Sequence, residues 1–175
     1  GTAYTFTVAA TNSAGTGSTS TASSAITPVG VPGYSTGVSA TGGNGQATVS
    51  WTAPASDGGA AITQYTVTSS PGSLTATTAS TSATVTGLTN GTSYMFTVTA
   101  TNSVGTGSAS TSSSVVIPAT LPGAPTGVSA TGGNAEAGVS WTAPASDGGA
   151  AITQYTVTSS PGSISGSASG TSLTL

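Results

Sequence analysis

The residues of this chain best suited to chemistry are three acids: Asp57, Glu136 and Asp147. Asp57 and Asp147 occupy equivalent positions in two Asp-Gly-Gly segments that lie 90 residues apart. The paired carboxylates of a glycoside hydrolase must lie within about 10 Å of each other, and a calcium ion needs six or more oxygen ligands. One carboxylate per repeat satisfies neither requirement. We therefore interpret both aspartates as turn residues that bond to the backbone beside glycines with positive φ.

The 175 residues include no histidine, lysine, arginine or cysteine. The many serine and threonine hydroxyls therefore have no side-chain base to activate one of them as a nucleophile. We predict no catalytic, no cofactor-binding and no metal-binding residues. Asn90-Gly91-Thr92 matches the N-glycosylation pattern, but Asn-Gly is also a strong turn signal, and we favour the turn.

Composition also excludes several classes of partner. Nucleic acids and anionic lipids are bound largely through Lys and Arg, which are absent here. No apolar run reaches the roughly 18 residues that cross a bilayer, so we expect neither nucleic-acid binding nor membrane insertion. Many threonines and few charges favour folded β-structure over disorder.

A repeat organises the chain. The 24 residues Ser50–Ser73 recur unchanged as Ser140–Ser163, and Gly1–Val8 is similar to Gly91–Val98 at the same offset of 90 residues. Prolines and glycines mark the boundaries between units, which is typical of short, fairly stiff linkers. The expected parts are the last two strands of one unit (1–28), a complete unit (29–118) and the first five strands of a third (119–175).

Apolar and polar residues alternate along most of the complete unit, which is the pattern of half-buried strands. Seven short strands separated by turn residues predict an antiparallel sandwich of two sheets. We expect the side chains of Trp51, Tyr65, Val67, Val85, Phe96 and Val98 to be mostly buried. The expected apolar positions, strand by strand, are Val38 and Ala40; Ala47, Val49 and Trp51; Ile62, Tyr65 and Val67; Leu74 and Ala76; Ala83 and Val85; Tyr94, Phe96, Val98 and Ala100; and Val115 with Ile117.

An ordered set of motifs along the whole chain resembles the fibronectin type III repeat of bacterial proteins. The set comprises Pro122–Ala130, Trp51, Asp57-Gly58-Gly59 before Ile62–Val67, Leu88–Tyr94, and Thr97–Asn102 followed by a glycine-rich loop. The resemblance implies tandem, head-to-tail, seven-stranded β-sandwiches of the immunoglobulin-like class. It also implies that Trp51 fills the space between the sheets and that Tyr94 forms a tyrosine corner. Tyr4 and Trp141 are the matching residues of the first and third units.

These features together favour an extracellular structural protein, such as a stalk, surface fibre or filament sheath, without catalytic activity. A nearly invariant repeat supplies length, because each domain contacts mainly its neighbours. The alternative is a spacer or binding module of a larger adhesin or of a secreted enzyme that degrades polysaccharides. A decoration domain of a virus particle is a third option.

The expected partners are copies of the same chain, joined head to tail and through lateral edge contacts, with carbohydrate or cell-surface components as further candidates. Sheet edges are usually protected by charges such as Lys, which this chain lacks. Two arrangements of the incomplete units remain open. The chain is either a window of a longer continuous array, or a subunit whose hairpin completes the next copy by strand addition.

Overall fold

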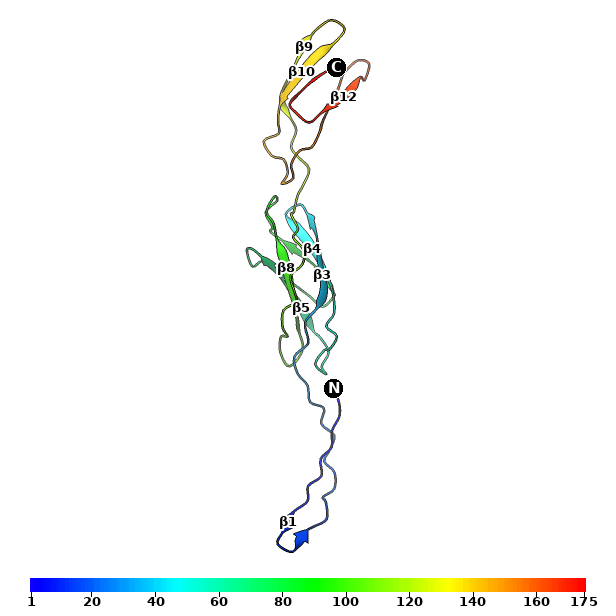
Figure 1. The fold of residues 1–175 in the computed structure, drawn as a ribbon, viewed down its shortest axis with the longest axis vertical. Helices are drawn as coiled ribbons and strands as arrows, with labels where there is room; N and C mark the ends of the chain where they lie inside the picture. Colours follow the sequence, from blue (N-terminus) through cyan, green and yellow to red (C-terminus); the bar gives the residue numbers. More distant parts are fainter. The chain divides into compact units, whose positions relative to one another are not determined.

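The protein is all-β. The computed structural model describes residues 1–175 and contains thirteen strands and no helix (Figure 1). By contact density the chain divides into two compact units, one of Gly1–Ala40, Val49–Thr84 and Met95–Ser114, the other of Thr41–Thr48, Val85–Tyr94 and Val115–Leu175. The strands are β1 (Thr11–Asn12), β2 (Gly15–Thr16), β3 (Thr36–Gly43), β4 (Gln46–Thr52), β5 (Gln64–Ser70), β6 (Thr75–Thr78), β7 (Ser82–Thr86), β8 (Met95–Thr101), β9 (Thr126–Gly132), β10 (Ala137–Thr142), β11 (Tyr155–Thr158), β12 (Ser165–Ala168) and β13 (Ser172–Thr174).

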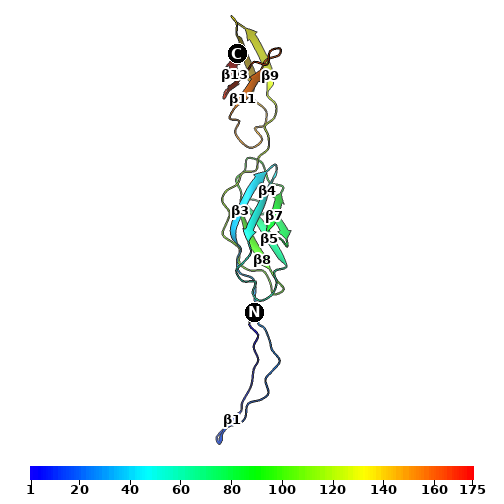
Figure 2. The ribbon, with the colours of Figure 1, turned by 90° about the vertical axis from the view of Figure 1, so that its right-hand side faces the viewer.

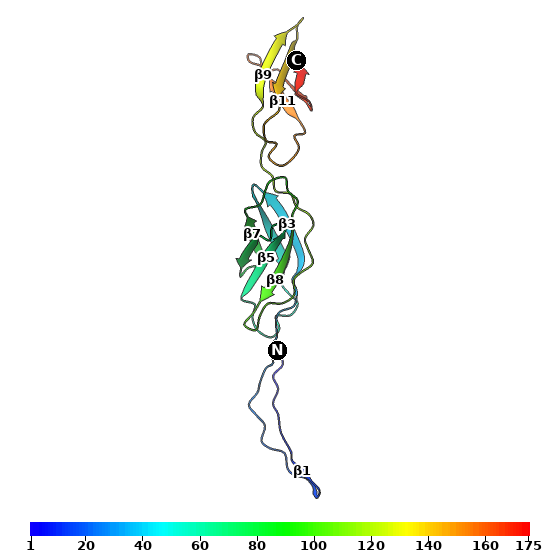
Figure 3. The ribbon, with the colours of Figure 1, turned by 90° about the vertical axis from the view of Figure 1, so that its left-hand side faces the viewer.

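The middle of the chain forms two three-stranded sheets. One has the strand order β3-β4-β7 and the other the order β6-β5-β8. The two sheets lie face to face as the layers of a sandwich (Figures 2 and 3). Strand β5 is central in its sheet and pairs antiparallel with both neighbours, Val67 lying opposite Ala76 on β6 and opposite Val98 on β8.

Strict alternation of small polar and apolar residues explains why these segments form strands with one buried face. Along β4, Ala47, Val49 and Trp51 are buried while the residues between them are exposed. Successive side chains of a strand point to opposite faces, so every second residue reaches the core. Fully burying a Val or Phe side chain contributes about 1.5–3 kcal/mol. The six residues expected in the core, Trp51, Tyr65, Val67, Val85, Phe96 and Val98, are all buried, which confirms that prediction.

Tyr94 forms the expected corner. Tyr94 is 6% exposed, and its hydroxyl oxygen accepts a hydrogen bond of 3.1 Å from the Thr89 backbone N–H. The bond ties the turn before β8 to the start of that strand. A buried phenol thereby satisfies its polar end while its ring remains in the core.

The last segment of the sandwich differs from the prediction. Val115 and Ile117 are 59% and 48% exposed, and no regular strand forms there. Instead, residues 107–116 run beside β8 through backbone bonds from Gly107, Ser110, Ser113 and Val116 to Ala100, Val98, Phe96 and Tyr94. The segment advances three residues for every two of its partner, so the period-two pattern of a strand cannot apply to it. We call this arrangement the serine ladder.

Residues 1–28 form a hairpin with the same ladder. Strands β1 and β2 pair beside its turn, and Tyr4 bridges Ile26 near its open end. Between them, backbone N–H groups of Gly17, Ser20 and Ser23 bond to the carbonyls of Ala10, Val8 and Phe6. Every residue from 1 to 28 is exposed.

Residues 126–174 form two separate small sheets. The order β13-β10-β9 corresponds to β7-β4-β3 of the sandwich, and β11-β12 corresponds to β5-β6. The pairs Tyr155–Ala168 and Val157–Gly166 repeat the pairs Tyr65–Thr78 and Val67–Ala76. Three of the four strand pairings of the sandwich are therefore reproduced, but β11 has a neighbour on only one edge.

Candidate functional site: an open apolar face

Both aspartates lie in turns, as predicted from the sequence. The Asp57 carboxylate accepts a hydrogen bond of 2.8 Å from the Gly59 N–H, and Asp147 accepts the equivalent bond of 2.9 Å from Gly149. Gly58 and Gly59 have φ values of 78° and 86°, in the region that favours glycine. A side chain at Gly58 would also collide with the Gly30 carbonyl. The third acid, Glu136, follows the β9–β10 turn and is exposed.

Asn90 acts as a turn anchor. Its side-chain oxygen accepts a 2.8 Å bond from the Gly45 N–H, and its amide nitrogen donates a bond of the same length to the side-chain oxygen of Asn44. The amide nitrogen that a glycan would modify is therefore already bonded, which supports the turn interpretation.

Asn102 is a hydrogen-bonding hub that sequence reasoning missed. It is 4% exposed, and its amide donates bonds of 2.7 Å to the Gly30 carbonyl and 2.8 Å to the Asp57 carbonyl. Its side-chain oxygen accepts from the N–H groups of Val104 and Gly105 at 2.9 and 3.2 Å. One buried amide thus joins the linker, the Asp-Gly-Gly loop and the loop after β8. An Asn directly after a strand and before a glycine-rich loop was the available signal.

The serine ladder was the second feature missed. Ser110 and Ser113 are 7% and 4% exposed, and their hydroxyl oxygens accept hydrogen bonds from the backbone N–H groups of Val98 and Phe96 at 2.9 and 3.1 Å. Each hydroxyl in turn donates to the next carbonyl along the chain. The spacing of three between serines, present also at Ser20 and Ser23, was the signal in the sequence.

The largest departure from a closed core lies between the two small sheets of residues 126–174. Here Val128 is 67% and Ile164 is 62% exposed. Val139 and Val157 are half-buried, whereas the equivalent Val49 and Val67 of the sandwich are fully buried. The face that forms a core in one repeat is open in the other.

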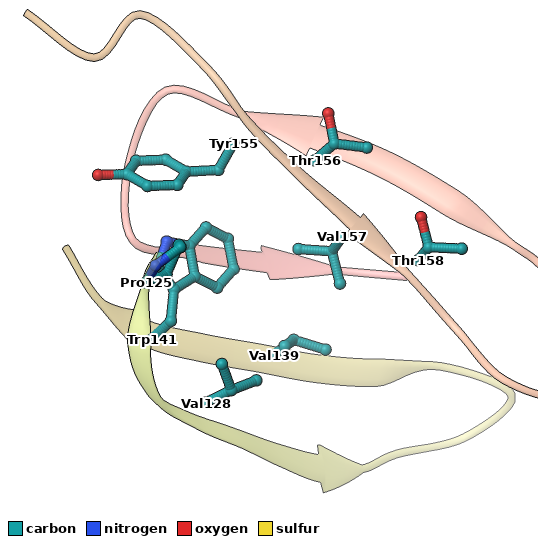
Figure 4. Close-up of a pocket in the computed structure, with 8 residues that line it drawn as sticks. All are labelled: Pro125, Val128, Val139, Trp141, Tyr155, Thr156, Val157 and Thr158. Carbon is teal, nitrogen blue, oxygen red and sulfur yellow. The ribbon is translucent and has the colours of Figure 1, made fainter. Parts of the chain in front are cut away.

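Two adjoining cavities, of 220 and 500 Å³, occupy this face and share Val128, Val139 and Val157 as lining residues. Figure 4 shows these valines and Trp141 directed into the space between the sheets, while the hydroxyls of Thr156 and Thr158 point away from it. The second cavity extends to Ile164 and Leu175. We call the two cavities together the open groove.

The aromatic wall of the groove is already formed. Trp141 is 8% exposed, and its ring centroid lies 5.3 Å from that of Tyr155 at an interplanar angle of 59°. The matching Trp51 and Tyr65 of the sandwich lie 5.4 Å apart at 60°. Such tilted pairs are favourable aromatic contacts. An apolar groove with a preformed wall can bind an apolar strand, and the one acidic side chain that lines it is that of Glu136.

The comparisons with known proteins agree with the observed fold. Residues 32–116 match the family model of the fibronectin type III domain. Such domains are generally non-catalytic modules, common in extracellular or surface proteins and typical of the spacer or binding parts of larger proteins. No curated protein sequence matches the chain. The structure contains no helix with the length and apolarity that a membrane span requires.

Several solved structures are similar to parts of the chain. A crystal structure of titin domains is 34% identical with a TM-score of 0.49, covering 51% of this chain and 32% of that one. The twitchin kinase region of C. elegans is 27% identical with a TM-score of 0.46, covering 51% of this chain and 17% of that one. The FN1–FN3 domains of chicken CNTN1 are 23% identical with a TM-score of 0.46, covering 99% and 64%. The chain thus spans about a third of the titin structure.

Proposed function

Because residues 32–116 match the family model of the fibronectin type III domain, we propose that the chain is an extracellular structural repeat protein of a stalk, surface fibre or sheath, without catalytic activity. In this proposal residues 1–28, 29–118 and 119–175 are parts of three tandem repeats of the type found in bacterial proteins. The partners are further copies of the chain, through head-to-tail and lateral edge contacts.

The observation that carries the proposal is that the two linkers are held by matching backbone hydrogen bonds. Gly30 donates a backbone bond of 2.8 Å to Gly58, and Thr120 donates the matching bond of 2.9 Å to Gly148. Gly33 to Ser56 and Gly123 to Ser146 form a second matching pair, each 2.9 Å long. A linker that is fixed in the same way at each repeat is what a protein needs if its repeats supply a regular step of length.

The low charge supports self-association as the mode of assembly. With three acidic residues and no Lys or Arg, the exposed edges carry none of the positive charges that usually prevent edge-to-edge pairing. Contacts between copies would then consist of neutral hydrogen bonds and small side chains. Because few charges are present, added salt has few interactions to screen.

Electron microscopy of the purified chain at increasing concentration tests the proposal. We expect filaments that persist between about 0.01 and 1 M salt, a range over which the Debye length falls from about 30 to 3 Å. A matched variant with Ser39→Lys and Ser50→Lys, both on the exposed face of the β3–β4 pair, should assemble in a salt-dependent manner. Single particles at every concentration, together with retention on a polysaccharide column, would instead support a spacer or binding module.

A further inference from the structure

Two asparagine–glycine pairs of the sandwich meet in one place. Asn44-Gly45 forms the turn between β3 and β4, and Asn90-Gly91 lies in the turn before β8. The other three asparagines of the chain, Asn12, Asn102 and Asn134, precede serine or alanine. An asparagine amide is chemically least stable before glycine, because no Cβ shields the backbone nitrogen that follows it.

The reaction of such a pair is an attack of the glycine nitrogen on the side-chain carbonyl carbon of the asparagine. The nitrogen forms a bond to Cγ, the Cγ–Nδ2 bond breaks, and the proton of the glycine nitrogen leaves with the amide group as ammonia. Water then opens the imide ring at either of its carbonyls. The products are aspartate, or isoaspartate in which the main chain runs through the side-chain carbons. Each conversion adds one negative charge to a chain whose formal net charge is −3.

We propose that Asn44 is a site of slow self-modification, in which its amide becomes a carboxylate, and that Asn90 is the residue that restrains this reaction. The Asn44 side chain is exposed, so water reaches it. Its amide nitrogen, which is the leaving group, forms no hydrogen bond with the protein. Water is the only co-reactant, and the inference does not depend on whether the chain forms fibres.

The Asn90 side chain holds both reacting groups. Its Oδ1 accepts a bond of 2.8 Å from the Gly45 N–H, which contains the attacking nitrogen, and its Nδ2 donates a bond of the same length to Asn44 Oδ1. Attack requires that Gly45 lose its proton and that the Asn44 side chain turn toward the nitrogen, so both bonds must break first. The Leu88 N–H also donates to the Gly45 carbonyl at 3.0 Å, which fixes the glycine on its other side.

Asn90 itself is better protected than Asn44. It is half-buried, and both polar atoms of its side chain are bonded. The Gly91 N–H that would attack it donates a bond of 2.9 Å to the Pro118 carbonyl. The two asparagine–glycine pairs are therefore unequally restrained, and we expect Asn44 to convert first.

The equivalent turn of the next repeat suggests a matched control. There Asn134 is followed by Ala135, which has a φ of 58°, close to the 65° of Gly45. A Cβ at Gly45 would lie 3.5 Å from the Leu88 carbonyl oxygen, an ordinary contact distance. Gly45→Ala should therefore keep the shape of the turn while shielding the attacking nitrogen.

Peptide mapping of the full chain after incubation at neutral to mildly alkaline pH tests the inference. Chymotrypsin is used because the chain has no Lys or Arg, and cleavage after Tyr34 and Trp51 yields a peptide whose one asparagine is Asn44. The readout is the fraction of this peptide that carries the mass gain of amide hydrolysis. We expect Asn44 to convert faster than Asn90. The rate should rise with pH, because the attacking nitrogen must lose its proton.

Asn90→Ala removes both restraining bonds and should raise the rate at Asn44 about tenfold or more. Asn90→Asp keeps an acceptor for Gly45 but loses the donor to Asn44, and should give an intermediate rate. Gly45→Ala should lower the rate at least about tenfold. Asn102→Ala removes a hub that bonds to Gly30, before β3, whereas Asn44 follows β3. It should destabilise the sandwich and leave the rate at Asn44 nearly unchanged.

Three results would overturn the inference. One is conversion of Asn90 before Asn44. Another is an unchanged or lower rate at Asn44 in the Asn90→Ala chain, which would show that Asn90 does not restrain the reaction. The third is an equal rise in the Asn102→Ala chain, which would show that general opening of the fold, and not release of this turn, controls the reaction.

Discussion

Residues 1–28 and residues 91–118 are identical at 19 of 28 positions, but they lie in opposite environments. Phe6 is 60% exposed, and Phe96, its equivalent 90 residues later, is 0% exposed. The ladder bonds are nevertheless the same, from Ser23 to Phe6 in one and from Ser113 to Phe96 in the other. Local hydrogen bonding is thus set by the segment itself, whereas burial depends on the sheet against which the segment packs.

This comparison separates two sources of stability. In the hairpin, the two arms are held together by backbone bonds, serine bonds and the hydroxyl pair Thr11–Thr16, and each such bond has a net value of about 1 kcal/mol. In the sandwich, the same bonds are supplemented by an apolar core. Isolated hairpins are marginally stable in water for this reason. Paired substitutions at equivalent positions of the two segments therefore measure how much the core adds to the free energy of unfolding.

The largest expected difference is between Phe96→Ala and Phe6→Ala. Phe96→Ala should lower the free energy of unfolding of the sandwich by about 3–5 kcal/mol, the usual effect of emptying a large aromatic site. Phe6→Ala should leave it unchanged, because Phe6 lies outside this core. Urea unfolding followed by the fluorescence of Trp51 measures both, in a Trp141→Phe background so that one tryptophan reports.

Protein concentration must be low enough in these measurements for copies to remain separate. If Phe6→Ala lowered the free energy of unfolding of the sandwich as much as Phe96→Ala does, the hairpin and the sandwich would not be independent. In that case the comparison between them would lose its basis.

A smaller difference is expected between Asn102→Ala and Asn12→Ala. Asn102 bonds to three carbonyls, whereas Asn12 only accepts one bond of 2.8 Å from the Ala14 N–H. Losing a buried amide and leaving its partners unpaired should cost about 2–3 kcal/mol at Asn102. At Asn12 we expect a change within about 0.5 kcal/mol, as for most exposed sites. Equal effects in urea unfolding would contradict the assignment of Asn102 as the hub that holds the linker.

The smallest difference concerns the serine ladder. Ser113→Ala leaves the buried Phe96 N–H without its hydroxyl acceptor and should cost about 1–2 kcal/mol. The same change at Ser23 removes the acceptor of the Phe6 N–H. That group lies in an exposed hairpin where water can replace the hydroxyl, so the change should cost nearly nothing. Ser113→Thr keeps the hydroxyl and should therefore retain most of the stability that Ser113→Ala loses. If the Thr variant were as unstable as the Ala variant, the room available for the side chain, and not its hydrogen bond, would determine stability at this position.

The alternation of apolar and polar residues, together with the repeat, was sufficient to predict the sandwich, its first six strands and the six buried core residues. They failed at Val115 and Ile117, because a ladder that advances three residues for every two of its neighbour has no period of two. Asn102 was missed for a different reason. Its importance arises from the meeting of Gly30, Asp57 and Ala60, which lie 72, 45 and 42 residues away along the chain. The open groove could be inferred from the repeat register, but its preformed aromatic wall could not.

The serine ladder also has a mechanical consequence. The nine residue steps from Gly107 to Val116 lie beside only six steps from Ala100 back to Tyr94, the residue before β8. Six strand steps cover about 20 Å and nine extended steps about 30 Å, so detachment of this segment would release about 10 Å of slack. A tether built from such repeats would lengthen under tension before any core opened. Single-molecule pulling should record this short extension ahead of the main rupture, and its absence would show that ladder and core yield together.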